Sequence, residues 1–283
     1  MLRCTMCTGT EKRVAIVQVG VTLRNMGPES TPALMAECAR AAEDAGLESL
    51  WITDHIAIPP DNAVGSGGRY VDPLVTLGWL AGITHRIKLA TGVIVLPYRA
   101  PLQLARQVAA LQELSGARVL LGVGIGWMDA EFRVLGVPRS ERGRLSDESL
   151  AFFDRCFSND TIEAHGQPFL FLPRPPKPPV LVGGRAPHAL RRAARYGDGW
   201  LPMGLEADQL APLRARYCEF TDALGKPPGS ISVMASLPWH DSGRLAAALG
   251  AFAEAGADRV VCGLRYRDAA EYRRAVESLA RAI

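Results

Sequence analysis

Short apolar runs rich in β-branched residues alternate along this chain with longer segments in which apolar positions recur every three to four residues. The first run, Val14 to Val21, predicts a strand, and the segment Pro32 to Ala45 after it predicts a helix that ends at Gly46. The second run, Glu48 to Asp54, is followed at once by His55. The predicted buried strand therefore ends with the carboxylate of Asp54 next to the imidazole of His55. A strand, a helix and a second strand with a polar end form one repeat of an α/β barrel.

The same alternation continues to the end of the chain. Further apolar runs predict strands over Ile87–Leu96, Arg118–Val123, Val180–Val182, Asp198–Pro202, Ile231–Ala235 and Arg259–Cys262. Amphipathic segments predict helices over Asp72–Thr84, Leu102–Ser115, Asp147–Phe157, His188–Tyr196, Ala207–Leu224, Arg244–Ala255 and Ala269–Ala280. Strands that alternate with helices through short crossovers predict an α/β fold of the (β/α)8 TIM-barrel class, with residues 14–283 as one domain. A small hairpin is expected as an insertion over Thr161–Leu172, turning at Gly166–Gln167.

Composition restricts the possible partners more than it changes the fold. A chain of 283 residues, 48% of them hydrophobic, is long enough for one such barrel and its core. The formal net charge of +3 is too small to indicate a nucleic-acid surface. The longest apolar run contains Lys88 and is too short to cross a bilayer. We therefore expect neither nucleic acid nor membrane among the partners.

The N-terminus and the cysteines bear on the compartment. Residues 1–13 lack the continuous apolar core of a signal peptide and are expected to form a flexible tail. Cys4 and Cys7 make a lone Cys-x-x-Cys without the second pair that would complete a zinc site, so no metal site is predicted. The other four cysteines lie inside predicted helices or strands. This usage favours a reducing, cytoplasmic compartment.

In parallel α/β barrels the carboxyl ends of the strands converge on one mouth, where the chemistry is located. His55 follows a strand directly and is the first candidate for catalysis; the alternative is a histidine that only caps its loop by hydrogen bonding. Glycines dominate the other strand ends, and a glycine lets a flat ring or a phosphate approach the backbone closely.

A phosphate site is expected at Gly183-Gly184-Arg185, because a helix starts just afterwards and its free N–H groups and dipole attract anions. The alternative is a plain helix-entry turn. Gly122 to Gly126 has a Gly-x-Gly-x-Gly pattern but not the spacing of a dinucleotide-binding loop. A Gly-x-Ser-x-Gly elbow and closely spaced histidines are also missing, which disfavours serine or metal hydrolysis. These features indicate a barrel whose chemistry comes from a cofactor.

Five motifs in chain order resemble the luciferase-like monooxygenase superfamily, whose members share a bacterial-luciferase-like TIM barrel. They are Ala41–Gly46 with Ser49–His55, Thr84–Val93 with Leu96–Pro101, Leu114–Arg118 with Gly122–Trp127, Gly183-Gly184, and Arg192–Trp200. Gly126-Trp127, Glu131-Phe132 and the acidic Asp147-Glu148 helix resemble the branch that uses the deazaflavin coenzyme F420.

The resemblance implies a cofactor lying across the barrel mouth, with its phosphate near Gly183-Gly184 and Gly204. It also implies a non-proline cis peptide between Gly92 and Val93. The expected cofactor-binding residues are Asp54, Thr91, Gly92, Val93, Gly126, Trp127, Gly183, Gly184, Arg185 and Gly204.

In deazaflavin-dependent sugar-phosphate dehydrogenases of this superfamily, the histidine that matches His55 acts as the base. The partner acid of those enzymes falls at Trp127, and this departure argues against a sugar phosphate and for a more apolar substrate. Arg99 and the loop from Pro59 to Tyr70 are expected to shape the substrate pocket.

The leading hypothesis is an F420-dependent oxidoreductase that transfers a hydride between the deazaflavin and a small organic substrate. The alternative is an FMN-dependent luciferase-like monooxygenase with the same barrel and phosphate site. A third, non-enzymatic hypothesis is a flavin-binding or assembly protein, for which His55→Ala would leave turnover unchanged. The resemblance further implies a homodimer formed through barrel helices.

Overall fold

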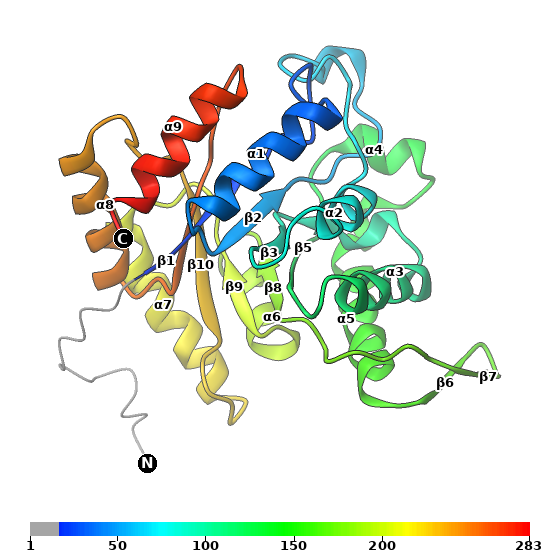
Figure 1. Cartoon of the computed structure of the whole chain (residues 1–283). Helices are drawn as coiled ribbons and strands as arrows, with labels where there is room; N and C mark the ends of the chain where they lie inside the picture. Colours follow the sequence, from blue (N-terminus) through cyan, green and yellow to red (C-terminus); the bar gives the residue numbers. More distant parts are fainter. Residues whose placement is uncertain (1–16) are drawn as a thin grey trace.

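The computed structural model describes residues 17–283, which form a closed barrel of parallel strands surrounded by helices (Figure 1). The strands are β1 Gln18–Thr22, β2 Ser49–Ile52, β3 Lys88–Thr91, β4 Ile94–Val95, β5 Val119–Gly124, β8 Val180–Gly183, β9 Gly199–Leu201, β10 Ser230–Ala235 and β11 Arg259–Cys262. Each pairs in parallel with its neighbours, and β3–β5 and β1–β11 pairings complete the ring. The TIM-barrel prediction is confirmed. The predicted tail 1–13, the Cys4 and Cys7 pair and the first residues of the predicted strand 14–21 lie outside the described residues.

Helices lie outside the ring of strands in Figure 1. They are α1 Pro32–Asp44, α2 Pro73–Ala81, α3 Pro101–Leu114, α4 Asp129–Val134, α5 Arg142–Ser158, α6 His188–Tyr196, α7 Ala207–Asp222, α8 Ser242–Glu254 and α9 Ala269–Ala280. Local sequence explains several starts. Thr31, Asp72 and Asp268 each accept a backbone N–H of the first turn with their side chains, and proline follows the first two of these caps.

Alternating positions of the strands fill the barrel and pack it against the helices. The inward set is Trp51, Ala90, Leu120, Leu181, Leu201 and Val261, all buried. Their chain neighbours, such as Leu50 and Val260, belong to the larger core between strands and helices. Val93 and Met234 pack on the inward set and are only partly buried. The barrel is therefore solid, and its carboxyl end has an apolar floor.

The predicted strand Ile87–Leu96 is wrong as one element, because it divides into β3 and β4. A cis peptide joins Gly92 to Val93 between the two pieces, as the resemblance implied. The first piece pairs with both β2 and β5, whereas β4 pairs with β5. The strand is therefore interrupted at the point where its pairing with β2 ends and only its pairing with β5 continues.

Helix boundaries differ more than strand positions. Helix α5 starts at Arg142 rather than at Asp147, and the short helix α4 was not predicted. The hairpin insertion is confirmed as β6 Thr161–Ala164 paired antiparallel with β7 Gln167–Leu170, and it projects from the barrel in Figure 1. Its turn residues are His165 and Gly166, one position before the predicted turn, and both have positive φ. Within residues 17–283, no helix combines the length and the apolar character needed to cross a bilayer.

Candidate active site

The carboxyl end of β2 places an imidazole against a buried carboxylate. His55 Nδ1 lies 3.0 Å from Glu131 Oε2, and the two side chains are 18% and 1% exposed. His55 comes from the loop after β2, whereas Glu131 lies in α4, which follows β5. The barrel therefore brings together two residues 76 positions apart in the chain.

The Glu131 carboxylate is held by four donors. Its Oε1 accepts the backbone N–H groups of Ile56 at 2.6 Å and Ala57 at 3.0 Å. Its Oε2 accepts the Tyr98 hydroxyl at 2.9 Å in addition to His55. Burial alone would raise the pKa of Glu131, but the donors at Ala57, Ile56 and Tyr98 and the nearby imidazole lower it below its ordinary value. The carboxylate is therefore ionised at neutral pH.

An ionised acceptor determines which nitrogen of His55 carries a proton. A carboxylate can only accept, so Nδ1–H donates to Glu131, and Nε2 is the nitrogen that can take up a proton. Two aromatic rings flank the imidazole: Tyr70 with its ring centre at 5.0 Å and Trp127 at 6.0 Å, the latter edge-on. Trp127 is 64% exposed. The site thus has one proton acceptor with apolar walls.

Asp54, expected to contact the cofactor, is used inside the protein. Arg99 donates to both of its carboxylate oxygens, at 2.6 and 2.9 Å, and the Val95 N–H donates to Oδ2. Arg99 also reaches Asp72, the cap of α2. The side chain of Asp54 is fully buried and that of Arg99 is 11% exposed. This ion pair secures the loop that carries His55 and the start of α2.

The predicted phosphate-binding residues lie on the opposite side of the ring, after β8 and β9. Gly184 and Gly204 have φ of +122° and +67°, and a side chain built on Gly204 would meet nothing within 4 Å. The N–H groups of Arg185 and Ala186 make no backbone hydrogen bond within residues 17–283. Arg185 is exposed. This edge of the mouth presents open backbone close to the start of α6.

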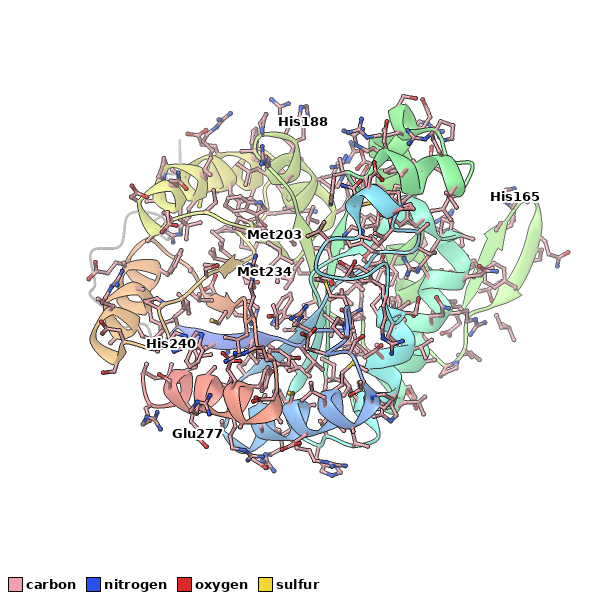
Figure 2. All side chains as sticks on the ribbon, turned by 90° about the horizontal axis from the view of Figure 1, so that it is seen from above. His165, His188, Met203, Met234, His240 and Glu277 are labelled. Atoms are coloured by element: carbon pink, nitrogen blue, oxygen red, sulfur yellow. The ribbon has the colours of Figure 1, made fainter. Side chains whose placement is uncertain are left out.

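Gly92, Val93 and Met234 lie between these two edges. Met203 pairs with Met234 across β9 and β10 and is 47% exposed, and both lie towards the middle of the barrel in Figure 2. Thr91, in contrast, is buried and donates to the Gly122 carbonyl at 2.7 Å, so it joins two strands. Of the predicted residues, Asp54 and Thr91 are therefore bound to protein partners.

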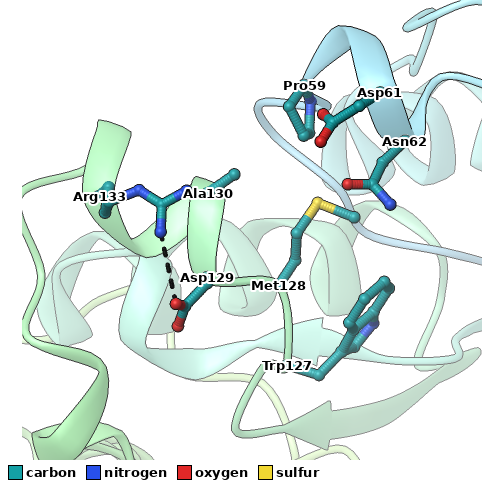
Figure 3. Close-up of a pocket in the computed structure, with 8 residues that line it drawn as sticks. All are labelled: Pro59, Asp61, Asn62, Trp127, Met128, Asp129, Ala130 and Arg133. Carbon is teal, nitrogen blue, oxygen red and sulfur yellow. Dashed lines mark hydrogen bonds and ion pairs between the residues drawn. The ribbon is translucent and has the colours of Figure 1, made fainter.

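A shallow cavity of about 320 Å³ adjoins Trp127 (Figure 3). Asp61 and Asn62, from a short 3-10 turn in the loop after β2, form one wall. Residues 127–130 and Arg133 form the other, where Arg133 pairs with Asp129 at 3.4 Å. The loop from Pro59 to Tyr70 thus lines this cavity and places Tyr70 beside His55, and its role in shaping a substrate pocket stays a prediction.

Sequence reasoning missed Glu131 and Tyr98 as members of the site. In the sequence, Glu131-Phe132 belongs only to the resemblance to the F420 branch, and Tyr98 only to the motif Leu96–Pro101. The one available signal was the length of the segment between the glycines after β5 and the next predicted helix. A six-residue helix in that segment places Glu131 under His55.

Comparison with known proteins identifies the family of the chain. A family model described as luciferase-like monooxygenase matches residues 14–281. An uncharacterized protein of Mycobacterium tuberculosis is 35% identical over 206 residues, which cover 66% of this chain and 71% of that protein. The F420-dependent hydroxymycolic acid dehydrogenase of Mycobacterium tuberculosis is 29% identical over 214 residues, covering 70% of this chain and 56% of the enzyme.

Solved structures share the fold at low identity. An F420-dependent secondary alcohol dehydrogenase in complex with an F420-acetone adduct superposes with a TM-score of 0.79 at 17% identity, covering 94% of this chain and 98% of its own. A type II Baeyer-Villiger monooxygenase component from Pseudomonas putida, in complex with FMN, gives a TM-score of 0.64 at 18% identity, covering 78% and 68%. Relatives and structural neighbours therefore include proteins of both cofactor types. From its motifs, its barrel and the family match over nearly its whole length, the chain belongs to the luciferase-like monooxygenase family.

Proposed function

We propose that the protein is an F420-dependent oxidoreductase that acts on a small, neutral and largely apolar organic substrate. The observation that carries this proposal is the His55–Glu131 pair at one edge of the barrel mouth. It faces open glycine backbone on the opposite edge across an apolar floor. A base at one edge and an anion-binding edge at the other suit a redox ring tethered by its phosphate.

The residues present fit such a group. Gly204 leaves space against the backbone, and the N–H groups near α6 and the Arg185 side chain offer donors to a phosphate. Val93 and Met234 offer an apolar surface for a flat ring. When bound, a deazaflavin supplies the hydride donor or acceptor, because carbon replaces the flavin ring nitrogen that favours oxygen chemistry.

The protein's own residues manage the proton. Nε2 of His55 takes the hydroxyl proton of an alcohol as it is oxidised, or returns it to the carbonyl in the reverse direction. Glu131 stabilises the imidazolium and keeps the ring in the tautomer that leaves Nε2 free. Tyr70 and Trp127 limit water around the imidazole and favour an apolar substituent on the substrate.

Charge around His55 also supports a neutral substrate. Arg99 is paired with Asp54 and Asp72, and Arg133 with Asp129. Within the described part of the chain, these guanidinium groups already have carboxylate partners, so an anionic substrate would compete with existing ion pairs.

Titration of the purified protein with F420 and, separately, with FMN tests the proposal. We expect F420 to bind and FMN to bind at least about tenfold more weakly, a difference of about 1.4 kcal/mol. Saturable binding of FMN alone would overturn the assignment and favour the monooxygenase alternative.

A substitution at Gly204 tests where the cofactor binds. Gly204→Asn adds a side chain that tolerates positive φ, so we expect F420 affinity to fall about tenfold with little change in stability. Gly225→Asn is the matched control, because Gly225 has a φ of +65°, similar open surroundings and a position at the start of the segment before β10. Equal F420 affinities for the two variants would place the cofactor elsewhere.

We also propose that the chain pairs with a second copy through α2. This helix contains no charged residue, yet Val75 and Trp79 on its outer face are 68% and 37% exposed. A helix that is apolar on all sides is normally covered, and an uncharged face meets no like-charge repulsion from an identical copy. Light scattering should give the mass of a dimer that Val75→Glu reduces to a monomer and Leu224→Glu, at another exposed site, does not. A monomeric wild-type protein contradicts the proposal.

A further inference from the structure

Tyr98 contributes a buried hydroxyl to the site that its packing does not require. The ring lies in a small apolar cluster with Val95 and Phe132, at 5.1 Å and nearly perpendicular to the Phe132 ring. The hydroxyl leaves this cluster and donates to Glu131 Oε2, the same oxygen that faces His55 Nδ1. A phenylalanine would fill the same space. The hydroxyl therefore serves the carboxylate and not the core.

The Tyr98 hydroxyl and His55 Nδ1 both donate to Glu131 Oε2, so each hydrogen bond weakens the other. Burial and then the hydrogen bond and charge of Glu131 raise the pKa of Tyr98, so the phenol remains protonated and donates at every relevant pH. Each donor to a carboxylate lowers its basicity. The Tyr98 bond thus reduces the charge on Oε2 that is available to the imidazole, and the low local dielectric strengthens this effect.

Other ionisable groups around the pair have their own partners or remain neutral. They are Asp54 paired with Arg99, Arg24 paired with Glu29, and the phenol Tyr70, whose pKa is raised by burial and by Glu131. Among the described residues, Glu131 is the carboxylate in direct contact with His55. A change in its basicity is therefore expected to act directly on the imidazole.

We propose that Tyr98 is a positioning residue that tunes the proton affinity of His55 through Glu131. Its hydroxyl fixes the carboxylate beneath the imidazole and weakens the hold of that carboxylate on the imidazolium. His55 then releases its proton more readily after each reaction cycle. The catalytic role of the His55 proton rests on the proposed function. The effect of Tyr98 on the proton affinity of His55, in contrast, is a property of the protein without cofactor.

The test is an NMR titration of the His55 imidazole in cofactor-free protein, comparing wild type with Tyr98→Phe. The His55 signal is assigned by its loss in His55→Asn. Removal of the hydroxyl leaves the carboxylate more basic, so the titration midpoint should rise by roughly 0.5 to 1 pH unit. Phe132→Leu disturbs the same cluster without removing a donor from Glu131, and it should lower stability while leaving the midpoint unchanged.

A midpoint that stays constant or falls in Tyr98→Phe overturns the inference. An equal rise in Phe132→Leu would also overturn it, because loosened packing would then account for the shift. If the midpoint rises as expected and F420 nevertheless fails to bind, the role of Tyr98 stands while the proposed function falls. The two claims can therefore fail separately.

Discussion

Replacing His55 with asparagine should lower turnover with F420 by ~100- to 10,000-fold, the usual contribution of a positioned acid or base. The substitution removes the proton acceptor while keeping a small polar side chain between Tyr70 and Trp127. Because the predicted phosphate edge lies across the mouth, F420 affinity should change little. The loss is therefore expected in kcat and not in binding.

The measurement is F420 reduction or F420H2 oxidation with a substrate found by screening neutral alcohols and ketones. His85→Asn is the matched control, since His85 is exposed outside the mouth and its backbone contact with Glu43 does not involve the ring. Turnover of His55→Asn equal to that of wild type would remove the histidine from the mechanism and favour the non-enzymatic hypothesis.

Glu131→Gln is expected to be nearly as damaging, although this side chain touches no substrate. The amide oxygen can still accept from Ile56 and Ala57, but an amide nitrogen then faces His55 Nδ1. A donor in that position reverses the tautomer, so Nε2 carries the proton and cannot accept another. The imidazolium also loses its counter-ion. We expect a fall in kcat of about 100- to 10,000-fold, similar to tautomer reversal in other carboxylate–histidine pairs.

The pH dependence separates this effect from simple misfolding. Because the pKa of Glu131 is lowered, its carboxylate stays ionised from neutral pH down to pH values below the ordinary pKa of a glutamate. The ion pair therefore favours imidazolium over that whole range, and its loss should move the His55 titration to lower pH. Glu148→Gln removes an exposed carboxylate on α5 that pairs with Arg144, and it should change neither rate nor titration. An unchanged titration in Glu131→Gln would contradict the account.

The fold could be read from the chain because barrel strands and helices have different periodicities. The strand Arg259–Cys262 and the helices His188–Tyr196 and Ala269–Ala280 were predicted to the residue. The main strand error was Ile87–Leu96, where the apolar run continues through a change of ladder partner that periodicity cannot detect. Helix α4 was missed because six residues are too few to establish a helical period.

The site could be predicted only in part, for a similar reason. His55 was identifiable because it directly follows the predicted strand Glu48–Asp54, and the glycines because they lie at or just after the ends of β8 and β9. Glu131 lies outside that pattern, and no local spacing connects it to a histidine 76 positions earlier. Asp54 had the same strand-end signature as His55, but its pairing with Arg99 is a long-range contact. The sequence therefore predicts which residues lie at the barrel mouth, but it does not predict which side chains they contact there.

The central claim is that a Glu131-oriented His55 exchanges the substrate proton beside an F420 ring. Anaerobic single-turnover mixing of F420-loaded protein with a neutral alcohol, from about pH 5 to 9, tests it most directly. We predict that the colour of oxidised F420 fades at a rate that rises as one imidazole loses its proton, and that this pH dependence disappears in Glu131→Gln. Fading with the same pH dependence in both proteins would contradict the account. So would the absence of fading together with substrate-dependent oxygen consumption, in a separate aerobic assay, by protein loaded with chemically reduced FMN.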